Sequence, residues 1–301
     1  MFADAVVETI VFVLRKGSKR DNDVRIVNCD NRLLTYQEKQ IGQKTFQKTH
    51  ANAISINITE GSVKLKTKLD KGNVSLGYLV NINQAIALKY DRSQSLFRSA
   101  KGANYKKVID GRNIDRYSLV WDGWFLAYDV KKIHSCKRTD IFDAEEKLFF
   151  RRVGDRLIAT LDHEQYYALN TLVVITSKTP ERVSLKYVLA LINSYLLNYY
   201  YVTYLKSTKK VFSEIQARQL SKIPMLVPNM EDQTEKHRHD KIVTYVELLL
   251  ELNRKYRTTK EKMRQEQLSQ EISITDEKLN RLIFDIYGLT DSEIEMIHQN
   301  G

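Results

Sequence analysis

The chain has 301 residues, of which 43% are hydrophobic, enough for a large core, so disorder of the whole chain is excluded. It carries 48 lysine and arginine residues against 37 acidic ones, a formal charge of +11, so we expect an anionic partner, with nucleic acid first and an anionic membrane surface second. Cys29 and Cys136 show no CxxC spacing, which excludes a disulfide framework and a structural zinc site and fits a reducing, cytoplasmic compartment.

Two apolar runs have the length expected of a targeting or membrane-spanning segment. The N-terminal run contains Asp4 and Glu8, and its basic residues follow it, whereas a signal peptide has the opposite order. Residues 187–205 are nearly free of charge and are about as long as a bilayer requires. Their polar side chains, including Asn193 and Asn198, would lack partners in lipid. We therefore expect a buried helix and no membrane partner.

The N-terminal part of the chain predicts a few strands. Residues 5–14 alternate and are rich in valine and isoleucine, which predicts a strand that begins abruptly at the chain start. Further strands are expected near residues 24–28 and 53–58. Either these strands complete a small unit, or residues 5–14 are the tail of a domain that lies upstream.

Residues 76–180 consist of short apolar runs separated by polar turns, and each run predicts a strand. Turns are expected at Asp122-Gly123 and at Gly154-Asp155. The pattern as a whole predicts a mixed or antiparallel sheet. In chain order the runs are LGYLVNI, YSLVWDGWFLAYDV, EKLFFRRVGD, RLIATLD and NTLVVITS.

The periodicity becomes helical at Ser184, which is expected to be an N-cap. The apolar positions that recur at intervals of three and four residues are Leu185, Val188, Leu189, Ile192, Leu196, and Tyr199 or Tyr200. A second, short helix is expected to start at Ser213, which has capping-box spacing with Gln216, and to end before Pro224.

The C-terminal third predicts helices. A long amphipathic helix has a single apolar stripe, formed by Ile242, Val246, Leu249, Leu252 and Tyr256. A second helical segment ends at Gly288, which suits a C′ position, and Thr290 and Glu293 have capping-box spacing for a final short helix. The chain is therefore expected to be α+β, with a mixed or antiparallel sheet domain followed by a helical C-terminal region.

Known catalytic motifs are missing from the sequence. It has no GxGxxG, GxxxxGK[ST], GxSxG or HExxH pattern, and it lacks the consecutive prolines of the loop that holds a flipped adenine in adenine methyltransferases. His237 and His239 are interpreted as part of a solvated linker. One segment, TDIFDAEEKLFF, loosely resembles the acidic and Glu-x-Lys cluster of magnesium-dependent nucleases through Asp140, Asp143, Glu145 and Lys147. Charged turns before strands often produce such a pattern, so we expect neither a catalytic residue nor a metal site.

The candidate DNA contacts are basic residues in turns and at strand ends. Some cluster around Gly102 and Gly111, where a backbone can approach a partner closely, and others flank Gly154 or follow the tyrosine-rich helix. Lysines are expected to contact phosphates, whereas the fork of an arginine matches the O6 and N7 edge of guanine. The tyrosines of the helix are expected to form a core or an interface rather than stack on bases. The candidates are Lys106, Lys107, Arg112, Arg116, Arg151, Arg152, Arg156, Lys206, Lys209 and Lys210.

Several segments occur in an order that resembles a known family. They are DAVVETIVFVLRK, VIDGRNIDRY with Gly111 and Tyr117, KLFFRRVGDRLIATLD, LKYVLALINSYLLNYYY with Leu-Ile-Asn-Ser at 191–194, FSEIQARQLSKIPM, and LNRLIFDIYGLTDSEIEMI. In this order and spacing they resemble the TaqI-like C-terminal specificity region of type IIG restriction-modification enzymes and related adenine-specific DNA methyltransferases. The first segment resembles the last strand of the methyltransferase core.

The resemblance implies a target recognition domain that grips double-stranded DNA opposite a catalytic domain, which flips adenine and transfers a methyl group from S-adenosylmethionine. This chain lacks that catalytic half, so no cofactor is expected in it, and the catalytic domain, fused or separate, is an expected partner. The chain is then a fragment, a split-gene subunit or a truncated remnant. The implied domains are 1–75, the tail of the methyltransferase core with a connecting segment, 76–228, the target recognition domain, and 229–301, the helical region.

Two other functions stay open at this point. The chain is a magnesium-dependent nuclease if the acidic cluster at residues 140–147 assembles around a metal ion. It is a helical scaffold subunit if the long helix at about 238–268 pairs with a partner through its apolar stripe.

Overall fold

The computed structural model describes residues 11–17, 22–30, 35–48, 58–206 and 214–300. The chain divides into two compact units, Met1–Lys64 and Leu65–Gly301. The domain boundaries expected from the sequence, at 75/76 and 228/229, remain predictions.

The first unit contains a β-hairpin. Strands β1 (Asp23–Asp30) and β2 (Thr35–Gly42) pair antiparallel, and a 3₁₀ helix, η1 (Gln43–Lys48), follows. The expected strand near residues 24–28 lies within β1. Of the expected strand at 5–14, residues 5–10 lie outside the described ranges, and residues 11–14 have no strand structure. Of the expected strand at 53–58, residues 53–57 lie outside the described ranges.

The second unit is built around a four-stranded antiparallel sheet in the order β13-β12-β15-β4. Its strands are β4 (Val80–Gln84), β12 (Lys147–Arg151), β13 (Ala159–Asp162) and β15 (Leu172–Ser177). Successive side chains of a strand point to opposite faces, so Leu148 and Phe150 enter one hydrophobic core and Phe149 enters another. Both faces of this sheet are therefore covered.

Short strands form the layer on the Phe149 face, which we call the outer layer. A four-stranded sheet in the order β14-β7-β10-β6 and the pair β11-β5 make up this layer. Its strands are β5 (Ala87–Leu88), β6 (Leu96–Phe97), β7 (Tyr105–Ile109), β10 (Phe125–Ala127), β11 (Ile133–Ser135) and β14 (Tyr167–Ala168). The short helices η3 (Arg92–Gln94), η4 (Val130–Lys132) and α3 (Asp140–Asp143) connect them. The hairpin of β8 (Ile114–Asp115) and β9 (Ser118–Leu119) packs on β13.

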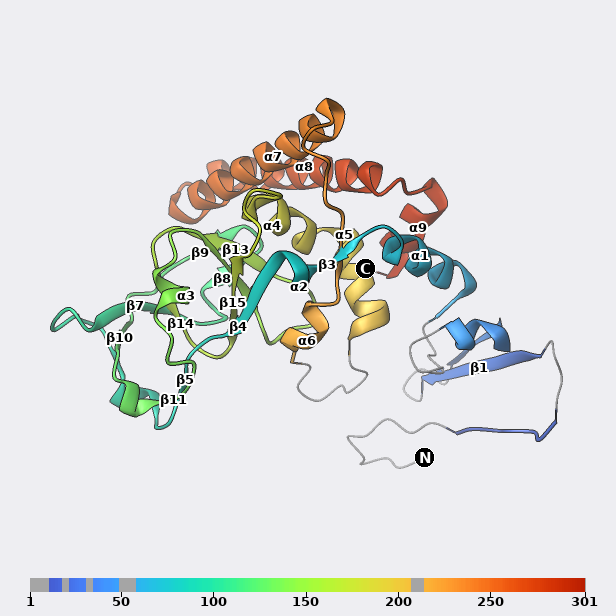
Figure 1. Cartoon of the computed structure of the whole chain (residues 1–301), viewed down its shortest axis with the longest axis horizontal. Helices are drawn as coiled ribbons and strands as arrows, with labels where there is room; N and C mark the ends of the chain where they lie inside the picture. The colour runs from blue at the N-terminus through green and yellow to red at the C-terminus, as the bar shows by residue number, and fades with distance from the viewer. Residues whose placement is uncertain (1–10, 18–21, 31–34, 49–57, 207–213, 301) are drawn as a thin grey trace. The chain divides into compact units, whose positions relative to one another are not determined.

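Helices pack on the opposite face of the central sheet, and Figure 1 shows α7 and α8 running alongside each other above α4. The helices are α1 (Glu60–Asp70), α2 (Leu76–Leu79), α4 (Leu185–Asn193), α5 (Tyr195–Tyr200), the π-helix η5 (Tyr201–Leu205), α6 (Ala217–Leu220), α7 (Gln233–Thr258), α8 (Lys262–Ile286) and α9 (Asp291–Asn300). Two short strands, β3 (Val74–Ser75) and β16 (Pro224–Met225), pair antiparallel beside them. This architecture confirms the α+β fold with a helical C-terminal region.

The helix expected from Ser184 onward is broken in two. The Ser184 side chain caps α4 as expected, by accepting a hydrogen bond from the backbone N–H of Tyr187. Ser194 then adopts an extended backbone, and its hydroxyl caps α5 by accepting from the N–H of Leu197. Asn193 ends α4 by bonding across to β13, where it accepts from the N–H of Ala159 at 2.9 Å and donates to its carbonyl at 3.0 Å.

The run LGYLVNI, expected to be a strand, begins with a helical turn. Residues of this turn receive backbone partners from the segment before β16, because Leu76 N–H donates to Ile223 O and Gly77 N–H donates to Ser221 O. A Cβ on Gly77 would lie 2.9 Å from the Cβ of Ser221, so the close approach needs glycine. The strand β4 starts only after this turn, at Val80.

The helical C-terminal region follows the expected pattern closely. Leu249 and the other apolar residues of the α7 stripe lie in the core, with Tyr256 at its half-buried end. Gly288 has a positive φ of 61° after the C-cap of α8, and Thr290 and Glu293 exchange the two hydrogen bonds of a capping box before α9. The short helix expected from Ser213 begins at Ala217, and Ser213 itself lies outside the described ranges. Within those ranges, no helix has the length and apolar character needed to span a membrane.

Candidate nucleic-acid interface

Positive charge is concentrated in one continuous stretch. Residues 86–139 contain twelve lysine and arginine residues and five aspartates, which gives them a formal net charge of +7. The formal charge of the whole chain is +11. This stretch forms strands β5 to β11, which make most of the outer layer and the β8–β9 hairpin. The outer layer therefore has an excess of positive charge that attracts a polyanion.

Lys106 and Lys107 are consecutive residues of β7, so they point to opposite faces of the small sheet. The Nζ of Lys106 lies 5.7 Å from the ring centroid of Tyr167. The Nζ of Lys107 lies 5.1 Å from the ring centroid of Trp121 and 3.6 Å from the carboxylate of Glu164. The Lys107 side chain keeps 45% of its surface exposed, so its ammonium group is accessible to a phosphate.

Arg112 follows β7 in the loop that leads to β8, and it is held at its base by Asp110. The two side chains meet through hydrogen bonds of 2.9 and 3.2 Å, and Arg92 donates to the same carboxylate at 2.9 Å. Burial raises the pKa of Asp110, but the bonds from Arg112 and Arg92 outweigh it and lower that pKa to about 2. Arg112 is still 78% exposed, so an ion pair orients a guanidinium that remains open to a ligand.

The backbone beside Arg112 lies against the residue that precedes β15. Gly111 N–H donates to the hydroxyl of Thr171 at 2.9 Å. A Cβ on Gly111 would lie 3.4 Å from the carbonyl oxygen of Thr171 and 3.6 Å from Cγ of Arg151. These are ordinary van der Waals distances, so the hydrogen bond to Thr171 is the contact that holds the loop carrying Arg112.

Three of the expected arginines are engaged within the protein. Arg116 forms a bidentate ion pair with Asp276 of α8, and its side chain is 30% exposed. Arg151 donates to the carbonyl of Ile114. Arg152 donates to Glu214 at 2.7 Å and to the carbonyl of Asn170 at 3.1 Å. Each of these guanidinium groups thus has a structural partner in place.

Two further candidates, Arg156 and Lys206, lie at a different turn. Arg156 is exposed beside Gly154-Asp155, and Lys206 donates to the carbonyl of Asp155 at 3.3 Å, so these two residues are brought together. Lys209 and Lys210 lie outside the described residues. The eight described candidates thus include one group, Lys106, Lys107 and Arg112, on β7 and the loop after it, and a second group, Arg156 and Lys206, at the turn after β12.

Comparison with known proteins identifies the region. Residues 106–225 match the family model of the TaqI-like C-terminal specificity domain. This part of the chain is similar to that domain, and we call residues 106–225 the specificity domain. The match begins in β7 at Lys106 and ends in β16 at Met225, so it contains every candidate contact named from the sequence. None of the curated proteins matches the sequence.

The fold is also similar to a solved structure described as the type IIL restriction-modification enzyme MmeI in complex with DNA. The TM-score is 0.53 at 11% sequence identity, and the similarity covers 94% of this chain. Because the identity is low, the likeness concerns the fold. The chain spans 41% of the length of that enzyme.

Arg98 is an exposed cation that lies just before the matched range of the specificity domain and was not among the expected contacts. Its guanidinium lies 3.9 Å from the ring centroid of Trp124 and donates to the carbonyl of Asp122. Stacking on a ring leaves the edge of a guanidinium free to donate to a phosphate or a base. The Trp-Asp-Gly-Trp turn was recognisable in the sequence, but its arginine partner directly follows β6, a different part of the chain.

The nuclease-like cluster in the specificity domain is dispersed. Lys147 is completely buried and pairs at 2.7 Å with the equally buried Asp162, directly opposite it on β13. Asp140 binds Arg138, and Asp143 accepts from the hydroxyl of Tyr167 at 3.0 Å. Over the described ranges, which contain all of these residues, no three histidine, cysteine, aspartate or glutamate side chains are placed to hold a metal ion. The cluster consequently gives the nuclease hypothesis no geometric support.

The tyrosines that follow α4 in the specificity domain lie inside. Tyr199, Tyr200 and Tyr201 are buried in the core shared by the helices, as the sequence predicted, and only the neighbouring Tyr195 is substantially exposed. His239 was expected in a solvated linker, but it is 7% exposed on α7 and stacks on Tyr187. The linker expected there is the first part of α7, because Asp232 caps that helix two residues after Met230.

Proposed function

We propose that this chain recognises specific sequences in double-stranded DNA, as the specificity part of a bacterial restriction-modification enzyme. One observation carries the proposal: the region that matches the TaqI-like specificity domain carries exposed cations on the basic outer layer, among them Lys107 and Arg112, whose side chains are 45% and 78% exposed. The similarity in fold to a restriction-modification enzyme that was solved with DNA supports the same function.

Lysine and arginine have different parts in this proposal. Lys106, Lys107 and Lys101 contact phosphates, which gives affinity for any sequence. Arg112 and Arg98 read base edges, because an oriented guanidinium can donate two parallel hydrogen bonds to guanine. Asp110 and Trp124 hold these two arginines in place, and such orientation lowers the entropy lost on binding.

A catalytic partner completes the proposal. We assign the chain to an adenine-specific methyltransferase or a type IIG enzyme, working in the cytoplasm in defence against foreign DNA. The catalytic domain, fused or separate, binds S-adenosylmethionine and flips the target adenine, while this chain sets the site. The scaffold alternative has less support, since Leu249 and Leu252 are buried against the rest of the chain and are not open to a partner.

The decisive experiment is selection from a randomised pool of DNA duplexes by the purified chain at several salt concentrations. Enrichment of one short motif, with binding that weakens steeply as salt rises, is the expected result. Salt-dependent retention without enrichment would contradict sequence-specific recognition by this chain, and absence of retention would contradict DNA binding altogether.

A further inference from the structure

The turn between the two long helices is the most basic short segment of the chain. Residues 254–264 contain six basic residues and one acidic residue, Glu261. The six are Arg254, Lys255, Arg257, Lys260, Lys262 and Arg264. We call this segment the hairpin tip. It lies outside residues 106–225, so the specificity-domain match does not account for it.

Two consecutive residues of the specificity domain fix the hairpin tip beside it. Asp115, in β8, lies 3.7 Å from the guanidinium of Arg257 near the end of α7. Arg116, the next residue, binds Asp276 of α8. Each helix of the hairpin is thus tied to the β8–β9 turn, and Figure 1 shows the joined end of α7 and α8 near β9. The hairpin tip is consequently held next to the loop that carries Arg112.

Three of the six basic residues form ion pairs within the protein, among them Arg257 with Asp115. Lys255 binds Glu251 and Arg264 binds Glu271. By contrast, Arg254, Lys260 and Lys262 are exposed, and none of them forms an ion pair with an acidic side chain in the ranges that the structure describes.

Helix stability does not explain all of these cations. Lys255 and Arg257 lie in the last turn of α7, where positive charge is favourable. Lys262 and Arg264, however, begin α8, whose first turn contains no acidic residue, and positive charge is unfavourable at that end. The positive charge at the start of α8 destabilises that helix, so its presence is better explained by binding to an anionic partner.

We infer that the hairpin tip is a second phosphate-contacting site, over which the backbone of the bound duplex continues beyond the specificity domain. The inference rests on the proposed DNA-recognition function and adds a contact that carries no sequence information. The partner is the sugar-phosphate backbone, because flexible cations at an exposed turn meet charge but present no ordered pattern of donors to base edges.

The test compares two triple variants of the full chain that remove the same charge. The hairpin-tip variant is Arg254→Gln, Lys260→Gln and Lys262→Gln. The control variant is Lys236→Gln, Lys241→Gln and Lys278→Gln, which neutralises exposed lysines of the same two helices. Lys241 is about 20 Å along α7 from Arg254 at 1.5 Å per residue. Glutamine is close to lysine and arginine in helix propensity, and urea unfolding verifies that both variants fold.

Affinity for the selected duplex and for a random duplex is then measured across salt concentrations. The hairpin-tip variant is expected to lose affinity for both duplexes alike, about 10-fold or more, with the slope of log K against log salt reduced by roughly two to three units. The control variant is expected to retain the slope of the unaltered chain. Ethylation of phosphates beyond the selected motif should weaken binding of the unaltered chain and leave the hairpin-tip variant unaffected.

The outcomes separate the two proposals. If both triple variants behave alike while Lys107→Gln weakens binding, the hairpin tip does not contact DNA, and the DNA-recognition function stands. If the hairpin-tip variant loses affinity for the selected duplex only, the segment reads sequence, and the inference of a backbone contact is overturned. If the unaltered chain binds no duplex, both proposals fail.

Discussion

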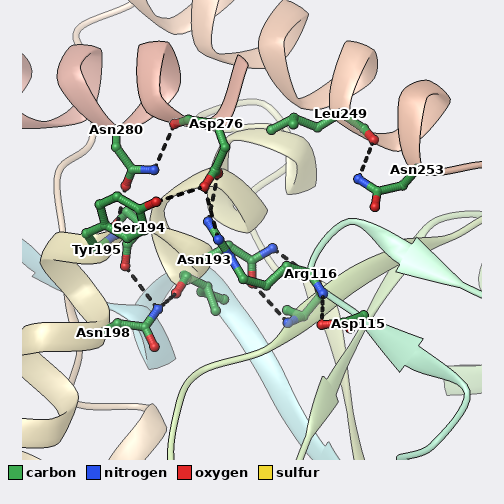
Figure 2. A network of polar contacts seen from close by, with 12 residues as sticks. Asp115, Arg116, Asn193, Ser194, Tyr195, Asn198, Leu249, Asn253, Asp276 and Asn280 are labelled. Carbon is green, nitrogen blue, oxygen red and sulfur yellow. Dashed lines mark hydrogen bonds and ion pairs between the residues drawn. The ribbon is translucent and has the colours of Figure 1, made fainter. Parts of the chain in front are cut away.

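The guanidinium of Arg116, in the turn between β8 and β9, meets the carboxylate of Asp276, in α8, through two hydrogen bonds of 3.0 and 2.7 Å (Figure 2). The hydroxyl of Tyr195 lies 3.4 Å from the same carboxylate, and Asn280 links α8 to the start of α5 by accepting from the N–H of Tyr195. An arginine expected to read DNA therefore joins the specificity domain to the helical hairpin.

Removing the carboxylate of this pair should destabilise the fold. We expect Asp276→Asn to lower the free energy of unfolding by about 1 to 3 kcal/mol, less than a fully buried pair would lose, because Arg116 is 30% exposed. Urea unfolding measures the change. The matched control is Arg257→Gln, which breaks a more exposed pair at 3.7 Å and should cost less than about 0.5 kcal/mol. Equal losses in the two variants would show that Arg116 and Asp276 have no special role.

Asn193 should be more sensitive than its neighbours on the same helix. Asn193→Leu leaves the buried N–H of Ala159 without its partner, whereas the carbonyl of Ala159 still accepts from the N–H of Tyr117 at 3.2 Å. We expect a loss of about 1 to 3 kcal/mol in urea unfolding, the cost of one buried group that loses its partner. Asn253→Leu is the control, because its amide donates only to Leu249 O on its own helix. A loss no larger than that of the control would contradict the assignment.

Asp110 should make stability depend on acid pH. Its pKa in the fold, about 2, is below its ordinary value of 3.8, so its contribution is present above pH 3.8 and is lost as pH falls towards 2. The unaltered chain should be more stable than Asp110→Asn at about pH 6, and the difference should shrink at about pH 3. Urea midpoints at several pH values measure it. A difference that stays constant over this range would mean that the carboxylate charge does not stabilise the loop.

Arg112 and Lys107 should separate base reading from phosphate contact. We expect Arg112→Gln to weaken binding of the selected duplex about 10-fold to 100-fold more than binding of a random duplex, because one bidentate contact is worth about 1 to 3 kcal/mol of discrimination. Lys107→Gln should weaken both duplexes alike and reduce the salt slope by roughly one unit. Binding curves for the two duplexes at several salt concentrations decide between these roles, and equal losses in both variants would remove the assignment of Arg112 to base reading.

Local signals in the sequence predicted the fold well where the partners are close in the chain. The caps at Ser184 and Thr290 and the glycine after α8 each depend on residues within a few positions. The break after Asn193 was missed because its partner, Ala159, lies on a strand far along the chain. The turn that replaces the start of a strand at Leu76 likewise depends on the distant Ile223.

The same distinction applies to the candidate interface. Lys107 and Arg112 are exposed, as their prediction as DNA contacts requires. They could be predicted because the basic residues and the glycine around them are neighbours in the sequence. The internal partners of Arg116 and Arg152 are Asp276 and Glu214, and no local pattern predicts such pairs. Whether any candidate contacts DNA remains a prediction that the binding experiments address.

The two faces of the central sheet belong to different hydrophobic cores. Leu148 and Phe150 pack in the core formed with the helices, whereas Phe149 and Val174 pack in the core of the outer layer. The central sheet therefore separates the core of the outer layer from the core of the helices, and the β8–β9 hairpin reaches the helices through Arg116 and Asp276. A protein organised in this way can accept mutations in the core of its outer layer while the distant helical core keeps the packing that holds it folded.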